Sequence, residues 1–314
     1  MGQELGVPLS ALKTTGNTGI PSNDVKLDKI VGLLLCKKGF KVPAMDTKDF
    51  NDTIAYLQSK TIAADPNDRL YPILNFMGAT DTTEAANVIK STYGQSKGYN
   101  EQSQSFDVDL KYIGIGAFKN LRQWSNSEDI CAYLVDTTFI GGRKNKSGDF
   151  LPFDIDFIVK PPKYGNGKDT ATETMSTVIF KDSEALTSQI VPFVFDKNDF
   201  SADSELHGCI DLIVSKVNNT TVKVFTKVSH SDLYDKYSTQ LAVAGAWKVV
   251  DAVSGAIKTG WTVAVSAANK GWAFTGLTGV NDIYLVDPTA LAALNVGSET
   301  AGGFECEEAA RLGE

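Results

Sequence analysis

Short segments of alternating apolar and polar residues recur along this chain. The clearest are residues 106–110 and 153–159, which place apolar side chains on one face and aspartates on the other. Residues 221–228 alternate in the same way directly after Asn218-Asn219, a pair that tolerates hairpin turn conformations. Strands this short, separated by turn signals, predict a mainly β protein built as a sandwich or small barrel.

Other apolar runs and a few helical patterns complete the predicted elements. Residues 46–60, 119–126 and 231–246 carry apolar side chains at helical spacing, and Pro288 is expected to end a strand and open a short helix through Leu294. The remaining predicted strands are residues 25–35, 70–76, 131–136, 177–180, 190–195, 209–214, 247–250, 261–265, 271–274 and 282–287.

The order of these segments predicts three parts. Residues 1–24, rich in Gly, Thr, Asn and Ser, are expected to form an extended N-terminal arm that is either free or laid on a neighbouring subunit. The polar, acidic residues 196–205 suggest a boundary. It separates a β-barrel or sandwich core with a few short helices (25–205) from a smaller, β-sandwich-like C-terminal domain with an acidic tail (206–314).

Composition excludes several classes of protein. The 314 residues suffice for one large or two ordinary domains, and the net charge of −8 argues against a surface that grips nucleic acid. The four cysteines lie far apart, so free thiols in a reducing compartment are expected rather than a zinc site. The N-terminus lacks a signal-peptide pattern, and the sequence has no apolar run long enough to span a membrane.

The candidate chemical groups all have simpler interpretations. The pairs Asp107/Asp109 and Asp154/Asp156 could bind a cation or serve a glycosidase, but alternating strands usually turn such residues to a solvated or subunit-facing surface. Gly114-Ile115-Gly116 lacks the third glycine of a dinucleotide site, and residues 165–169 lack the phosphate-loop spacing. His207 and His230 have no nucleophile motif to support a triad. The sequence therefore predicts no enzyme, and no catalytic, cofactor-binding or metal-binding residue.

One basic cluster stands out in this acidic chain. Arg143, Lys144 and Lys146 lie in a predicted turn at residues 141–148. A loop tip of this kind is usually solvated, but it could also pair with an acidic patch on a neighbouring copy. These three residues are the candidates for an intersubunit contact.

Several stretches together resemble a known class of protein. They are Tyr71-Pro72-Ile73-Leu74-Asn75, the alternating strand at 106–110, Leu134-Val135-Asp136 before a glycine turn, and residues 285–291 near the end of the C-terminal part. From about residue 25 onward the chain is similar to virion structural proteins of phages of Bacteroidetes-type bacteria, of the major tail (tail tube) kind. The resemblance implies a barrel or sandwich used in many copies, closing into rings through intersubunit strand pairing, with the C-terminal part facing outward and without catalytic residues.

The leading hypothesis is accordingly a non-enzymatic tail tube protein without a cofactor. It would form homo-oligomeric rings or a tube, contact other virion proteins, and let DNA pass without specific binding or membrane contact. It would be made and assembled in the cytoplasm of the bacterial host and reside in the virion. Two alternatives stay open: a phage head protein (capsid, decoration or connector), and a carbohydrate-binding or glycan-hydrolysing surface module.

Overall fold

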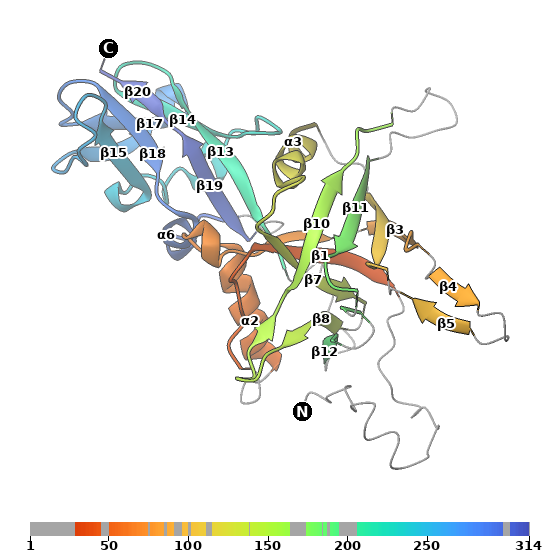
Figure 1. Cartoon of the computed structure of the whole chain (residues 1–314). Helices are drawn as coiled ribbons and strands as arrows, with labels where there is room; N and C mark the ends of the chain where they lie inside the picture. Colours follow the sequence, from red (N-terminus) through yellow and green to blue (C-terminus); the bar gives the residue numbers. More distant parts are fainter. Residues whose placement is uncertain are drawn as a thin grey trace. The chain divides into compact units, whose positions relative to one another are not determined.

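The computed structural model divides into two compact units (Figure 1). Unit 1 comprises Met1–Leu57 and Pro66–Glu205, and unit 2 comprises Gln58–Asp65 and Leu206–Glu314. The residues that the structure describes are 29–44, 50–74, 76–84, 87–90, 96–99, 102–110, 115–137, 139–163, 174–183, 185–186, 189–194, 206–297 and 302–313. The expected N-terminal arm at residues 1–24 and the boundary segment 196–205 lie outside these ranges.

Unit 1 is organised around a barrel-like path of antiparallel strands, whose two ends are joined by chain continuity between β2 and β3 and not by strand pairing. β1 pairs with β2 and β7, β7 with β10, β10 with β11, β11 with β6, and β6 with β3. Only residue 75 separates β2 from β3, so one continuous stretch of chain joins the two ends of the path. The strands are β1 (Ile30–Lys37), β2 (Tyr71–Leu74), β3 (Phe76–Asp81), β6 (Ser105–Leu110), β7 (Ile130–Asp136), β10 (Phe153–Val159) and β11 (Thr174–Phe180).

The inward-facing side chains of this path form the core of unit 1. The alternation predicted at residues 106–110 and 153–159 is confirmed, with Val108, Ile155 and Phe157 buried. Each of β1, β3, β6, β7, β10 and β11 contributes to the same apolar cluster, and side chains of α3 (Ile115–Trp124) pack against it. A barrel filled in this way needs no separate covering layer on its inner face.

β7 is buried on both faces, which shows that the barrel is covered there on the outside as well. On the outer side Tyr133 stacks on Phe150, with ring centroids 4.9 Å apart, and meets Phe40 edge to face at 6.2 Å. The Tyr133 hydroxyl donates to the carbonyl oxygen of Phe150 at 2.9 Å. Burial raises the pKa of Tyr133 far above its usual range, so this phenol stays protonated as a donor.

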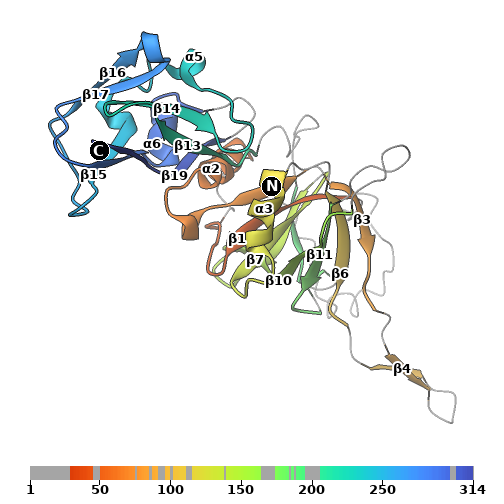
Figure 2. The same ribbon diagram turned by 90° about the horizontal axis from the view of Figure 1, so that it is seen from above.

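Unit 1 contains further strands and helices, and α2 begins in unit 1 and ends in unit 2. α2 runs over Phe50–Thr61, and the predicted helix residues 46–49 lie outside the described ranges; α3 starts four residues before the predicted residue 119. A hairpin of β4 (Asn87–Lys90) and β5 (Ser96–Tyr99), which the sequence pattern did not predict, stands away from the barrel strands in both views (Figures 1 and 2). The remaining elements are η1 (Pro66–Asp68), β8 (Phe139–Lys144), β9 (Phe150–Leu151) and β12 (Val191–Val194).

Unit 2 is built from two sheets. One has the order β16-β17-β14-β13-β19 and the other β15-β18-β20. Their inward side chains form one core cluster that includes three large rings, Trp247, Trp272 and Phe274. The strands are β13 (Cys209–Lys216), β14 (Thr221–Thr226), β15 (Trp247–Asp251), β16 (Thr262–Ser266), β17 (Gly271–Thr275), β18 (Asn281–Leu285), β19 (Gly303–Glu308) and β20 (Ala310–Leu312).

Two segments of unit 2 differ from the prediction. Residues 231–246 do not form one helix: α5 covers only Tyr234–Tyr237, and η2 follows at Ala244–Ala246. The expected acidic tail contains β19, which pairs in parallel with β13, and β20, which pairs with β18. The sequence pattern did not predict β19, because its glutamates are uncommon in strands and its pairing partner β13 lies almost a hundred positions earlier in the chain.

The short helix predicted at Pro288 is present as α6 (Pro288–Ala293). The carboxylate of Asp287 accepts a hydrogen bond from the backbone N–H of Ala290 at 3.0 Å, which caps the helix start. Both units thus contain mainly antiparallel sheets with a few short helices, and the prediction of a mainly β fold is confirmed.

Candidate functional site

The predicted turn at residues 141–148 is only partly a turn, because Gly141, Gly142, Arg143 and Lys144 are the last four residues of β8, and the loop starts at Asn145. This loop is shaped by its own hydrogen bonds. The side-chain oxygen of Asn145 accepts from the backbone N–H groups of Ser147 and Asp149, both at 2.9 Å. Gly148 has a φ of 86°, a conformation that glycine adopts without strain. Lys41 binds the Asp149 carboxylate at 2.9 Å, and this contact, with Asn145, holds the pKa of Asp149 below its usual value. These contacts fix the conformation of the turn, which together with Arg143 and Lys144 is called the basic tip.

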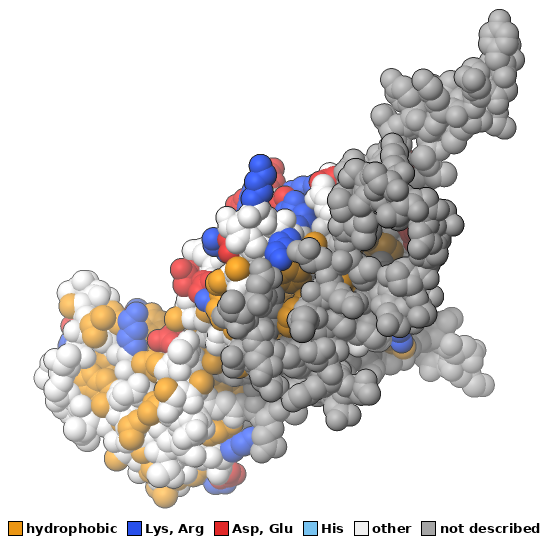
Figure 3. Space-filling view, turned by 90° about the horizontal axis from the view of Figure 1, so that it is seen from below, with side chains coloured by type: hydrophobic (Ala, Val, Ile, Leu, Met, Phe, Trp, Pro, Cys, Tyr) orange, Lys and Arg blue, Asp and Glu red, His pale blue; other side chains and the backbone are white. Residues whose placement is uncertain are grey.

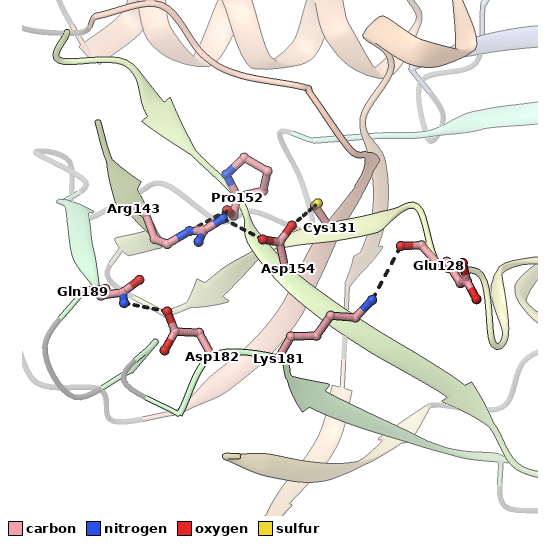
Figure 4. A network of polar contacts seen from close by, with 8 residues as sticks. All are labelled: Glu128, Cys131, Arg143, Pro152, Asp154, Lys181, Asp182 and Gln189. Atoms are coloured by element: carbon pink, nitrogen blue, oxygen red, sulfur yellow. Dashed lines mark hydrogen bonds and ion pairs between the residues drawn. The ribbon is translucent and has the colours of Figure 1, made fainter. Parts of the chain in front are cut away.

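Arg143, on β8 next to this loop, lies in a different environment from Lys144 and Lys146. Its Nε and Nη2 donate to the carbonyl oxygen of Pro152 at 3.0 and 2.8 Å, and Nη2 lies 3.3 Å from the Asp154 carboxylate (Figure 4). Lys144 and Lys146 are exposed. Arg143 thus binds groups of its own chain, and the exposed cations of the cluster are Lys144, the last residue of β8, and Lys146, in the loop.

Asp154 links Arg143 to a buried thiol. Cys131 Sγ donates to the other carboxylate oxygen at 3.1 Å (Figure 4). Burial, with the hydrogen bond to Asp154, raises the pKa of Cys131 to about 12. Cys36, its register partner on β1, is also buried, and burial raises its pKa as well. Both thiols are therefore protonated at neutral pH, and the four cysteines are free, as the sequence indicated.

Three of the four aspartates in the alternating strands, Asp107, Asp154 and Asp156, form ion pairs with cationic side chains. Asp156 lies 3.1 Å from the Lys181 ammonium group, which also donates to the Glu128 carbonyl oxygen (Figure 4). Asp107 accepts from Lys160 at 2.8 Å and from the Thr177 hydroxyl at 2.6 Å. The described residues contain no group of three or more His, Cys, Asp or Glu side chains suited to a metal ion. Asp107, Asp154 and Asp156 thus bind cationic side chains of their own unit.

The Asp107 ion pair gives a pH-dependent contribution to stability. The contacts with Lys160 and then Thr177 lower the pKa of Asp107 in the folded protein. Their contribution is present above the unfolded-state pKa of about 3.9 and is lost as the pH falls through the lower folded-state value. We expect Asp107→Asn to lower the free energy of unfolding by about 1 kcal/mol at pH 7 and to have little effect at a pH of about 2.

Urea titrations at the two pH values measure this difference. Asp109→Asn is the matched control, because Asp109 is half-buried two residues along the same strand and takes part in neither of these hydrogen bonds. An equal loss at both pH values in Asp107→Asn would show that the ion pair does not stabilise the fold.

The other candidate residues are not assembled into a site. His230 is an exposed turn residue with a φ of 51°, and the neighbouring Ser229 hydroxyl shares a hydrogen bond with Thr226 at 2.5 Å. Ile115 and Gly116 are the first residues of α3, while Gly114 and residues 165–169 lie outside the described ranges, so the predicted bend from strand to helix stays a prediction. His207 belongs to unit 2 and lies beside Gly302, where a Cβ atom would come within 2.2 Å of the His207 carbonyl oxygen.

Comparison of the sequence with protein-family models and with curated proteins gave no match. Within the described residues, each helix is too short or too polar to cross a membrane.

Proposed function

We propose that this protein is a non-enzymatic structural protein of a phage particle, the tail tube protein, which assembles as stacked rings. The β4–β5 hairpin carries the proposal. It leaves the barrel between β3 and β6, and among the described strands β4 and β5 pair with each other alone. A two-stranded hairpin is marginally stable by itself in water. Pairing with a neighbouring copy would stabilise it and would supply the intersubunit strand pairing that the resemblance implies.

The charge of the chain is compatible with a DNA-conducting channel. DNA binding requires a basic surface, and this chain carries a net charge of −8. The described aspartates on the outer face of the barrel are largely matched by lysines and an arginine of the same unit. A surface of this kind repels phosphate groups or does not bind them, so DNA would pass along it without specific binding.

Assembly state tests the proposal directly. Purified protein should form rings or tubes with a central channel in negative-stain images, and light scattering should show particle mass rising with concentration. Closed shells would support a head protein instead. A stable monomer at every concentration that also binds glycans would contradict the tail tube proposal and favour the carbohydrate-binding alternative.

The basic tip gives a second, finer prediction. Lys144→Glu/Lys146→Glu should reduce the yield of rings or tubes, because the exposed cations would no longer pair with an acidic patch on a neighbouring copy. Arg143 stays unchanged, since it holds Pro152 and Asp154 within its own chain. Lys248→Glu, at an exposed position of unit 2, is the matched control. Unchanged assembly with a folded double variant would exclude the tip from the subunit contact.

A further inference from the structure

The strands at the edges of the sheets differ in how they are protected against pairing with another chain. Natural edge strands carry charges, prolines or bulges that discourage such pairing. Among the described edge strands longer than two residues, β16 is the one with neither a charged residue nor a proline: its sequence is Thr-Val-Ala-Val-Ser. Examples on other edges are Asp81 in β3, Lys97 in β5, Pro192 in β12, Lys248 in β15, Glu307 in β19 and Arg311 in β20.

The pairing of β17 shows which backbone groups of β16 are free. The N–H of Phe274 donates to the carbonyl oxygen of Thr220, directly before β14, at 2.7 Å. Successive strand residues direct their N–H and C=O groups to opposite edges, so Ala273 faces β16, where its register partner is Ala264. Val263 and Val265, on either side of Ala264, therefore direct their N–H and C=O groups outward. None of the described residues bonds to these outward groups.

The sequence of β16 reads almost the same in both directions. Two hydroxyl residues, Thr262 and Ser266, enclose two valines, which enclose the central Ala264. If two copies pair antiparallel about Ala264, each outward valine faces the other valine of the second copy. The outward N–H and C=O groups then all find partners, alanine faces alanine, and hydroxyl faces hydroxyl. This pairing brings no like charges together and forces no large side chain against another.

The surface beside this edge is compatible with such an approach. Thr262 and Ala264 are exposed, and Val265 is 42% exposed. The nearby Lys258 ammonium group lies 2.9 Å from the Asp251 carboxylate, which matches its charge within the chain. On the face seen in Figure 3, unit 2, at the lower left, shows mainly orange apolar and white side chains with few charged ones.

We infer that β16 is a self-association edge: it pairs antiparallel with β16 of a second copy about a two-fold axis that passes between the two Ala264 residues. The contact joins two five-stranded sheets into one continuous sheet across two unit 2 modules. A two-fold contact uses the same patch on both copies, which is why a palindromic strand suits it. The inference rests on unit 2 alone and does not depend on the tail tube proposal.

Disulfide trapping tests this register. In the proposed pair, Ala264 lies opposite Ala264 of the second copy at a position without hydrogen bonds between them, where Cα atoms are about 4.5 Å apart. That separation lies in the range of about 4.4–6.8 Å that a disulfide requires. Full-length Ala264→Cys treated with diamide should form a covalent dimer at least about tenfold faster than the controls, since the two thiols are held together before oxidation.

Two variants control for chance collisions and for the strand contact. Ala268→Cys places a thiol at another exposed alanine of unit 2, and it should cross-link slowly. Ala264→Cys/Val265→Pro removes an outward N–H group from the edge while leaving the bonds to β17, and it should also be slow. Equal rates for Ala264→Cys and Ala268→Cys, or no effect of the proline, would overturn the inference.

A second measurement needs no cysteine and separates this contact from tube assembly. Ala264→Lys opposes two ammonium groups at the centre of the contact, so sedimentation velocity should show less of the dimer than in wild type or Ala268→Lys. Rings and tubes of Ala264→Lys should look unchanged in negative stain, because β16 lies in unit 2 and the proposed ring contacts lie in unit 1. A dimer that persists in Ala264→Lys would contradict the β16 pairing whatever the state of the tubes.

Discussion

Replacing Trp272 with alanine should destabilise unit 2 by about 4 kcal/mol, a large effect for one substitution. The side chain is fully buried at the centre of the unit 2 core, with ring contacts to Trp247 and Tyr234. Its indole N–H donates to the carbonyl oxygen of Ser238 at 3.0 Å. Truncation would leave a large cavity and also remove the donor of that carbonyl group, and both changes lower the free energy of unfolding.

Urea titration followed by far-UV circular dichroism and tryptophan fluorescence measures the loss. The fluorescence separates the units, because Trp247 and Trp261 report on unit 2 and Trp124 on unit 1. Trp261→Ala is the matched control: that ring is half-buried, and we expect roughly half of the effect. A shift for Trp272→Ala no larger than for Trp261→Ala would mean that Trp272 is not the centre of the core.

The sequence pattern predicted individual strands well and their pairing poorly. Strand alternation is a local property, so the faces of residues 106–110 and 153–159 could be read directly from the order of apolar and polar residues. The barrel-like path depends on β1 pairing with β7, a hundred residues later, and no local pattern encodes that register. β19 was missed for the same reason: its glutamates suggest a solvated tail, and only the parallel pairing with β13 makes it a strand.

The basic cluster and the outward aspartates likewise combine features that the sequence predicts with features that it does not. The exposure of Lys144 and Lys146 at a turn follows from local composition. The different environment of Arg143 does not follow from local composition. Its partners Pro152 and Asp154 lie 9 and 11 residues further along the chain and come close only when the chain folds back. Likewise the aspartates were assigned to an outward face, but their pairing with Lys160 and Lys181 depends on which strands become neighbours.

The closure of the barrel can be tested at Gly32. The register of β1 against β7 shifts between Ile30 and Gly32, and at this irregularity β1 also pairs with β2. A Cβ atom on Gly32 would come within 2.6 Å of the Leu74 side chain and 2.7 Å of the Ile73 carbonyl oxygen. The Ile73 carbonyl oxygen belongs to the backbone, so it cannot move away by a side-chain rotation. We therefore expect Gly32→Ala to destabilise unit 1 by about 3 kcal/mol.

Gly78→Ala is the matched control, because it isolates the close approach from the general effect of replacing glycine in a strand. Gly78 also lies at a register shift of the barrel, between β3 and β6, but a Cβ atom there would meet only the Asp109 carboxylate at an ordinary 3.7 Å. Its replacement should leave stability unchanged or raise it by about 0.5 kcal/mol, by restricting the unfolded chain. Equal effects at the two glycines, in urea titrations of unit 1, would show that β1 and β2 can separate freely and that the barrel is not held closed there. A large loss at Gly32 alone would instead locate the closure at the place where β2 leaves β1 and continues into β3, since no other described strand joins these two ends of the path.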